Sequence, residues 1–241
     1  MQLLVINPNT SVSVTERLRE HVSGVVGSGV TLHTATARFG ASYIADEASF
    51  AVAGHAAIDA YALHCERHGE PDAVLLGCFG DPGVWALRQL TARPVIGLAE
   101  AAMREAAAWG RFAIVTGGAA WQPMLERLAH ASGFGEALAG VFVVEANGAQ
   151  LAADPVLAQA LLTAACRDAA VGANAVVLGG AGLAGMAAGI APALQVPLID
   201  SVSAGAKAVM AMASAGLTTS PTASGRAEWQ GVSEALLKRL S

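Results

Sequence analysis

Two segments of the chain can be laid over each other, and this internal repeat is the feature that most constrains the fold. Residues 72–83 read DAVLLGCFGDPG, and residues 174–185 read NAVVLGGAGLAG. Each segment leads through a helical stretch into a second strand-like run. The spacings are nearly equal, with 16 positions from Cys78 to Pro94 and 17 from Gly180 to the matching proline. Two such segments predict two related strand–helix–strand units.

Short strand-like runs alternate with longer helical patterns along the chain. The helical patterns lie near residues 12–26, 99–109 and 120–131. The strand-like runs read QLLVINP, DAVLLGC, PVIGLA, RFAIVTG, AVVLGG and PLID. Short β-branched runs separated by helices are typical of parallel sheets that helices cover on both faces. The predicted fold class is therefore α/β.

The repeat also predicts how the chain divides. We expect two pseudo-symmetric domains, each a short parallel sheet flanked by helices, with an active site in the cleft between them. The first domain is placed at residues 1–97 plus 205–241, and the second at residues 98–204. A helix over 227–240 would then pack on the first domain, after a polar loop at 218–226.

Composition and charge narrow the class of protein. Apolar residues make up 54% of the chain and charged residues 14%, which favours a densely packed fold over disorder. The net charge is −5 and there is no basic run, so we expect no nucleic-acid partner. The first apolar run lacks a preceding basic segment and is interpreted as a strand rather than a signal peptide. Glycines and Pro192 interrupt the uncharged stretch 175–194, which predicts a buried strand and loop rather than a membrane span. A cytoplasmic protein is expected.

Among the cysteines, Cys78 has the context that suits chemistry. It ends an apolar strand near a predicted helix start at Pro82, where backbone N–H groups and the helix dipole favour a thiolate. A thiolate is a nucleophile and a base, although a buried residue at a tight turn is the alternative. Cys65 and Cys166 lie in helical patterns and are expected to be small buried side chains. Because ligands bind beyond the carboxyl ends of parallel strands, Cys78 and Gly180 should face each other across one cleft.

No pattern in the sequence predicts a metal site or a cofactor. The His, Cys, Asp and Glu residues have no metal-ligand spacing, and no phosphate-loop or dinucleotide motif follows the first strand. No histidine is placed by a motif, and His55 could face the cleft or the core. The prediction is a thiol enzyme without cofactor or metal.

Six motifs occur in order along nearly the whole chain. They read INPNTS with Thr15 shortly after it, GCFGDPGVWALRQL, RPVIGLAEAA, GRFAIVTG, VVLGGAGLAGM and VPLIDSVSAGAKA. Together they resemble the aspartate/glutamate/hydantoin racemase superfamily, and within it the hydantoin and allantoin racemases most closely. The resemblance implies two α/β domains around one site, in which a cysteine from each domain serves one face of an acidic carbon. It also implies that no cofactor is used and that the substrate is a small hydantoin, ureide or amino-acid derivative.

The resemblance further implies roles for particular residues. Cys78 matches the first catalytic cysteine. Asn9 and Thr10 match a loop that borders the substrate, with a helix cap as an equally weighted alternative for Thr10. Thr116 matches the first of a Thr-Thr pair that holds a carbonyl or carboxylate. Gly117 stands at the second position of that pair and removes one hydroxyl.

Several apolar residues are also expected near the substrate. Ile44 matches such a residue and could equally belong to the core. Phe79 and Ala181, which follow Cys78 and Gly180, complete the expected substrate contacts. The loop that contains Leu183 and Met186 suggests an apolar wall. The acids Glu100 and Asp200 are expected to hold loops together by hydrogen bonds rather than to react.

The main departure from the family pattern is Gly180. The family has G-C-A-G at this point and the chain has GGAG, so the second thiol is absent. Three functions therefore compete: a racemase in which another group replaces the second acid, a decarboxylase or isomerase with one thiol, and a non-catalytic protein that binds a small ligand. A homo-oligomer is expected because the chain is rich in apolar helix faces.

Overall fold

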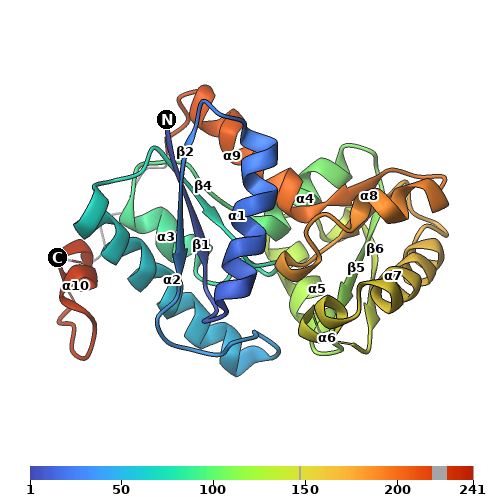
Figure 1. The fold of residues 1–241 in the computed structure, drawn as a ribbon, viewed down its shortest axis with the longest axis horizontal. Helices are drawn as coiled ribbons and strands as arrows, with labels where there is room; N and C mark the ends of the chain where they lie inside the picture. The colour runs from blue at the N-terminus through green and yellow to red at the C-terminus, as the bar shows by residue number, and fades with distance from the viewer. Residues whose placement is uncertain (147, 219–226, 241) are drawn as a thin grey trace.

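The chain folds around two four-stranded parallel sheets, as the sequence predicts (Figure 1). The structure is a computed structural model that describes residues 1–146, 148–218 and 227–240. The first sheet has the order β2 (Thr31–Thr36), β1 (Gln2–Asn7), β3 (Ala73–Leu76), β4 (Val95–Gly97), and the second the order β6 (Leu138–Val144), β5 (Phe112–Gly117), β7 (Ala175–Leu178), β8 (Leu198–Asp200). When the strands of each sheet are numbered along the chain, both sheets have the order second, first, third, fourth. The internal repeat of the sequence therefore corresponds to two sheets of the same topology.

Two strands lie outside the runs that the sequence analysis identified. They are β2 and β6, and both lie at the edge of their sheet. β2 reads TLHTAT, and all its residues are at least partly accessible to solvent. An edge strand pairs on one side only and need not be continuously apolar. The hydrophobic pattern of β2 is therefore too weak to identify it as a strand.

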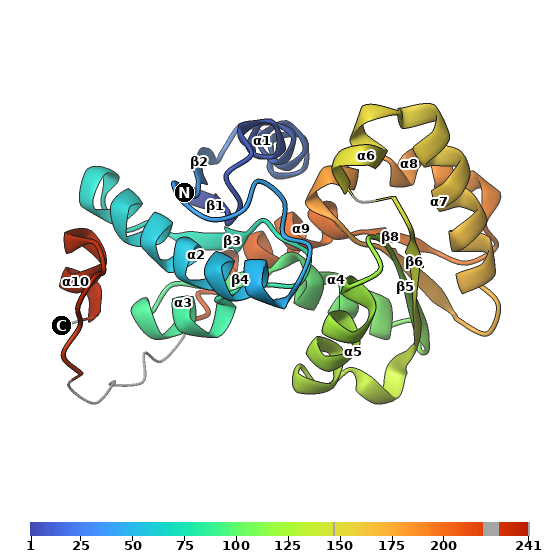
Figure 2. The same cartoon turned by 90° about the horizontal axis from the view of Figure 1, so that it is seen from below.

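Helices cover both faces of each sheet (Figure 2). Those of the first half are α1 (Val12–Val26), α2 (Glu47–His68) and α3 (Val84–Leu90). Those of the second half are α5 (Trp121–Ala131), α6 (Gly148–Ala153), α7 (Pro155–Ala169) and the short α8 (Ala187–Ile190). Between the halves lie α4 (Leu98–Ala107) and α9 (Ser201–Ser214), which pack against each other. The observed α1, α4 and α5 agree with the predicted helices to within two residues.

The strands alternate their side chains between different cores. In β1, Leu3 and Val5 face the largest core, whereas Leu4 and Ile6 pack with α2 and α3 on the other face. In β5, Ile114 faces the same large core, and the residues beside it face α7. This core also contains buried residues of α4 and α9, so it is continuous between the two halves.

The C-terminal helix is shorter than predicted but lies where it was expected. α10 (Glu234–Leu240) begins later than residue 227 and packs on α2, in the first half. The predicted polar loop at 218–226 lies outside the described residues from position 219 onward. Both sheets fall within the domain ranges predicted above. The exact division into 1–97 plus 205–241 and 98–204 stays a prediction.

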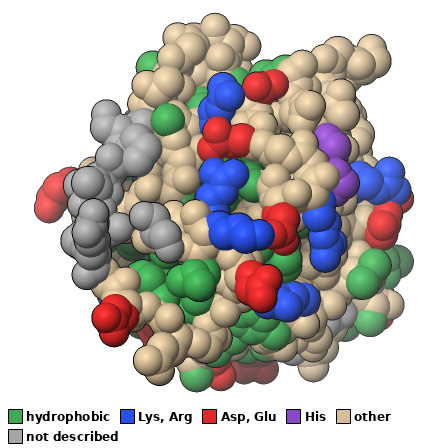
Figure 3. Space-filling view, turned by 90° about the vertical axis from the view of Figure 1, so that its left-hand side faces the viewer, with side chains coloured by type: hydrophobic (Ala, Val, Ile, Leu, Met, Phe, Trp, Pro, Cys, Tyr) green, Lys and Arg blue, Asp and Glu red, His purple; other side chains and the backbone are tan. Residues whose placement is uncertain are grey.

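The end of the molecule near α10 carries charges of both signs (Figure 3). Lys238 pairs with Glu66 at 2.6 Å, and Arg239 lies 3.6 Å from Glu70. In the described part of this face, basic and acidic side chains alternate, which gives no continuous positive surface of the kind that binds phosphates.

The uncharged stretch 175–194 forms the predicted strand, β7, and a loop, and it also contains the short α8, which was not predicted. Over the residues that the structure describes, none of the helices combines the length and the apolar character needed to cross a bilayer.

Candidate active site

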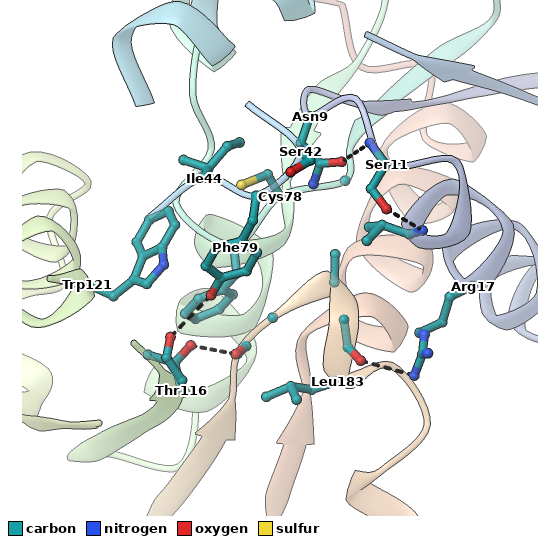
Figure 4. Close-up of a pocket in the computed structure, with 18 of the residues that line it drawn as sticks. Asn9, Ser11, Arg17, Ser42, Ile44, Cys78, Phe79, Thr116, Trp121 and Leu183 are labelled. Carbon is teal, nitrogen blue, oxygen red and sulfur yellow. Dashed lines mark hydrogen bonds between the residues drawn. The ribbon is translucent and has the colours of Figure 1, made fainter. Parts of the chain in front are cut away.

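A pocket of about 200 Å³ lies where the carboxyl ends of the two sheets meet (Figure 4). The first half contributes the segments that follow β1, β2 and β3, and the second half contributes the end of β5 and the segment that follows β7. This is the position at which parallel sheets bind ligands. The pocket brings together most of the predicted site residues: Asn9, Ile44, Cys78, Phe79, Thr116, Gly117, Gly180 and Ala181. Their roles toward a substrate stay predictions.

Thr10 is the predicted site residue that does not line the pocket. Its backbone N–H donates to the carbonyl of Ala41 at 3.1 Å. The cap of α1 is the next residue, Ser11, whose hydroxyl accepts from the Val14 N–H at 3.4 Å. Ser11 is therefore the cap of α1, and Asn9 and Ser11, rather than Thr10, line the pocket.

A network of amides and hydroxyls fixes the loop after β1. The buried Asn7 side-chain NH₂ donates to Asn9 Oδ1 at 2.8 Å and to Thr15 Oγ1 at 3.0 Å. Asn9 Oδ1 also accepts from the Ser11 N–H at 2.9 Å. With its oxygen engaged twice, Asn9 has its side-chain NH₂ left to donate to a ligand oxygen.

Cys78 lies at the end of β3 and is only 8% exposed. Burial raises the pKa of its thiol, and the negative charge of Asp81 raises it further. The expectation that a nearby helix start favours the thiolate is therefore wrong. The helix α3 begins at Val84 rather than at Pro82, and the loss of solvation outweighs any effect of its dipole. The raised pKa keeps the thiol predominantly neutral near pH 7.

Asp81, in the same loop, is a buried acid that the sequence analysis missed. Its carboxylate accepts from the N–H groups of Ala99 at 2.9 Å and Glu100 at 2.8 Å, at the start of α4. Burial raises its pKa to about 7, although these hydrogen bonds act in the opposite direction. The φ of Asp81 is 56°, in the left-handed region. The carboxylate lies so close to Gly97 that a Cβ atom at position 97 would overlap it. Asp81 therefore fastens the Cys78 loop to α4. The sequence signal was DPG directly after a strand, which is typical of a tight turn.

The second half presents Thr116 and Gly117 at the end of β5. The Thr116 hydroxyl donates to the carbonyl of Gly179 at 2.8 Å, so it joins β5 to the loop after β7. The carbonyl of Gly117 faces the hydroxyl of Tyr43 at 3.5 Å. Both residues thus contribute to the wall of the pocket, and the Thr116 hydroxyl positions the Gly180 loop.

Gly180 has a backbone conformation suited to glycine. Its φ is 144°, and its N–H donates to the hydroxyl of Ser201 at 3.2 Å. A Cβ atom here would lie 3.3 Å from Leu183 Cγ, so the conformation disfavours a side chain more than the space does. The neighbouring Gly179 lies against the ring of Phe79, where a Cβ atom would overlap the ring. The loops that contain Cys78 and Gly180 are therefore in contact across the pocket.

Several lining residues were not predicted from the sequence. The most polar of them is Arg17 on α1, whose Nη1 donates to the carbonyl of Gly182 at 3.2 Å. Ser13, Val14 and Arg17 have the spacing of one helix face, a pattern that could have identified them once the pocket was placed at the start of α1. The others are Ser11, Ser42, Tyr43, Gly77, Trp121, Gly179 and Gly182. Leu183 had been expected as part of an apolar wall, whereas Met186 is not among the lining residues.

The acids Glu100 and Asp200 hold elements together, as predicted. Glu100 pairs with Arg88 at 2.6 Å and with Arg104 at 2.7 Å. Asp200 caps α9 through the Ser203 N–H at 2.7 Å, and it also accepts from the Gly185 N–H. Neither acid lines the pocket.

The described histidines and cysteines form no metal centre. Within residues 1–146, 148–218 and 227–240, no group of three His, Cys, Asp or Glu side chains could hold a metal ion. His55 is exposed on α2 and contacts the edge of Phe39. Cys65 and Cys166 are buried in α2 and α7, as expected.

Comparison with known proteins finds matches along nearly the whole chain. The model of the Asp/Glu/hydantoin racemase family matches residues 3–209. The chain belongs to this family. Hydantoin racemase from Paenarthrobacter aurescens is 32% identical over 223 residues, which cover 91% of this chain and 94% of that protein. Allantoin racemase from Klebsiella pneumoniae, a solved structure, is 32% identical, with a TM-score of 0.88 and coverage of 96% and 97% of the two chains. Allantoin racemase from Pseudomonas fluorescens is 27% identical, with a TM-score of 0.89 and coverage of 95% and 100%.

Membership of the family has two consequences. The prediction of an isomerase of the racemase type is confirmed. The two-domain α/β architecture is confirmed as well, and it extends to more distant proteins. Maleate isomerase from Pseudomonas putida S16, for example, shares the fold at 14% identity with a TM-score of 0.66.

Proposed function

We propose that the protein is a cofactor-independent racemase that acts on an acidic carbon next to a carbonyl, with Cys78 as acid and base on one face. The substrate would be a hydantoin, a ureide or another amino-acid derivative. The observation that supports this most is the position of Cys78 in a pocket between the carboxyl ends of both sheets. The relatives that match nearly the full length include hydantoin and allantoin racemases.

The protonation state of Cys78 determines how such a reaction would depend on pH. Because the pKa of the thiol is raised, the neutral form predominates near pH 7. A neutral thiol can donate a proton at once, but it must ionise before it can remove one. Exchange of the substrate hydrogen should therefore become faster as the pH rises beyond 8.5, the approximate pKa of an ordinary thiol.

The opposite face of the substrate would lie against the Gly180 loop, which offers no ionisable side chain between Gly179 and Leu183. A proton on that face would come from water or from a hydroxyl of the pocket. General acid or base assistance is worth about a hundred- to ten-thousand-fold in rate. Exchange at the Cys78 face should therefore be faster than inversion.

A decarboxylase or isomerase with one thiol is the second candidate, because the neutral state of Cys78 favours it. Loss of carbon dioxide creates a carbanion without a base, and the carbanion then needs a single proton donor. The Asn9 NH₂ group is available to hold the oxygen of the resulting enolate.

The test follows single enantiomers of 5-substituted hydantoins and of allantoin by proton NMR in D₂O, with optical rotation measured in parallel. Loss of the α-hydrogen together with inversion supports the racemase. Exchange with retention indicates that Cys78 works alone, and arylmalonic acids should then be tested for decarboxylation. If binding persists while neither reaction exceeds the buffer rate, the protein is a non-catalytic binder and the proposal fails.

A further inference from the structure

Arg17 gives the pocket a positive charge. The side chain extends from α1 in the first half to the loop after β7 in the second half, where it reaches the carbonyl of Gly182 (Figure 4). It is half-buried and lies at the end of the pocket away from Trp121. Arg17 therefore marks one polar end of a site whose other end is apolar.

No carboxylate of the described chain neutralises this charge. The ion pairs formed by the described residues do not include Arg17, and no Asp or Glu lines the pocket. Arg19, two positions further along α1, differs from Arg17 in being exposed and in pairing with an acid, Glu16, at 2.8 Å. A half-buried guanidinium without an acidic partner is a site where an anion would be favourable.

The hydrogen bond from Arg17 to Gly182 leaves most of the guanidinium N–H groups available to a ligand. A guanidinium has five N–H donors in a planar fork, and the bond to Gly182 uses one of them. A backbone carbonyl is a neutral acceptor, whereas a carboxylate can accept two parallel hydrogen bonds from the fork. The hydroxyls of Ser11 and Ser13, which also line the pocket, lie 3.0 Å apart at the start of α1.

We propose that Arg17 makes the pocket select substrates whose reacting carbon carries an anionic substituent, such as a carboxylate side chain. This builds on the proposed function, to which it adds the class of substrate. The substituent binds at the Arg17 end, and the ring rests between Phe79 and the apolar side chains of Ile44 and Leu183. The reacting carbon then lies between the two ends, next to Cys78.

The experiment compares two ligands that differ by one charge. Racemic hydantoin-5-acetic acid and its uncharged amide are titrated into the protein by calorimetry. A racemic ligand undergoes no net reaction, so the measurement reports binding alone. We expect the acid to bind at least about tenfold more tightly than the amide, which corresponds to one charge-assisted interaction of about 1.4 kcal/mol. Added salt should reduce this preference.

Variants of two arginines on the same helix assign the effect. Arg17→Gln should weaken binding of the acid by about tenfold and change binding of the amide by less than about threefold. Arg17→Lys should retain part of the preference, because it keeps the charge but loses the fork. Arg19→Gln is the matched control and should leave both affinities unchanged.

The inference is overturned if acid and amide bind equally, if neither binds, or if Arg17→Gln weakens both alike. These outcomes are distinct from those that test the proposed function. A charge preference that depends on Arg17, in a protein that neither exchanges nor inverts hydantoins, contradicts the proposed function and supports this inference. Racemisation of neutral hydantoins without a preference for the acid has the opposite meaning.

Discussion

The loops after β3 and β7 have equivalent positions in the two halves, yet they are built differently. The first loop contains Cys78 and is fastened by its own acid, Asp81, which reaches the start of α4. The second loop contains Gly180 and is held by an acid outside the loop, Asp200 at the start of α9, which accepts a hydrogen bond from the Gly185 N–H. One loop therefore presents a reactive side chain from a rigid support, and the other presents backbone. The repeat thus preserves the scaffold more closely than the chemistry of the loops.

The largest expected effect comes from removing the thiol of the first loop. Cys78→Ala should lower hydrogen exchange of a substrate by about a hundred- to ten-thousand-fold, since it removes the proposed acid and base. NMR in D₂O measures the rate. Cys166→Ala, which removes a buried thiol that does not line the pocket, is the control and should keep the activity per folded molecule. Equal loss in both variants would contradict a special role for Cys78.

The next effect comes from adding a thiol to the second loop. Gly180→Cys should raise inversion relative to exchange by up to about a hundredfold, because it supplies a proton donor on the second face. The φ of 144° means that any side chain here costs about 1–3 kcal/mol of unfolding free energy. Gly180→Ala has the same strain without the thiol and should lose stability without gaining inversion. If both variants gain inversion alike, the thiol is not the cause.

Removing the hydrogen bonds by which Asp81 holds the first loop to α4 should have a moderate effect on stability. Asp81→Asn retains the shape but replaces one acceptor oxygen by an NH₂ group, which faces a backbone N–H that then lacks a partner. We expect a loss of about 1–3 kcal/mol in unfolding free energy at neutral pH. Denaturant unfolding measures it, with Asp200→Asn as the counterpart in the second loop.

The pH dependence of this variant provides a second readout. The folded pKa of Asp81 is raised to about 7, so the folded state holds this proton more tightly than the unfolded state does. The contribution to stability is present at low pH and is lost as the pH rises from about 4 to about 7. Asp81→Asn should lack this decline. An unchanged pH profile would show that Asp81 is ionised in the fold throughout this range.

The smallest effect on stability is expected at His21, which contacts Asp200, the acid that holds the second loop. His21 on α1 lies 3.2 Å from Asp200, and its hydrogen bond to this acid raises its pKa. A raised folded pKa means that its stabilisation is complete below about 6.5 and disappears as the pH rises through the folded value. His21→Asn should therefore cost less than about 1 kcal/mol at pH 5.5 and nothing at pH 9. The exposed His55 provides the control substitution, and a deficit that persists at pH 9 would exclude charge as its origin.

Much of the fold could be predicted because its signals are local. Buried central strands such as β3 and β7 are continuous apolar runs, and the repeat of these runs gave the two halves. The edge strand β2 was missed because its sequence, TLHTAT, is not continuously apolar. β6 was missed although it reads LAGVFVV, and the edge strands β4 and β8 were identified, so position at an edge does not by itself explain which strands were missed. The end of α10 nearest the chain terminus was predicted well, whereas its start was placed too early. Two residues of AEWQGVS indicate the later start: Gly231 has a φ of 73°, and the Ser233 hydroxyl accepts from the Leu236 N–H at 3.2 Å.

The site was predicted where a motif marks a strand end and missed where a side chain arrives from elsewhere. Cys78, Thr116 and Gly180 follow strands directly, so topology placed them at the pocket. Arg17 and Trp121 enter from helix faces, and their direction depends on how the helices pack. The pKa of Cys78 was mispredicted because burial, unlike proximity to a helix, depends on the whole tertiary structure.

The large core shared through α4 and α9 also determines how the molecule comes apart. Gly205 of α9 lies so close to Leu75 and Leu98 that a Cβ atom there would be 2.8 Å from Leu98 Cδ2. Pulling the two sheets apart would expose this packed apolar surface to water. We therefore expect the two halves to fold as one cooperative unit, so that neither half expressed alone folds. Heating should melt both sheets in one transition.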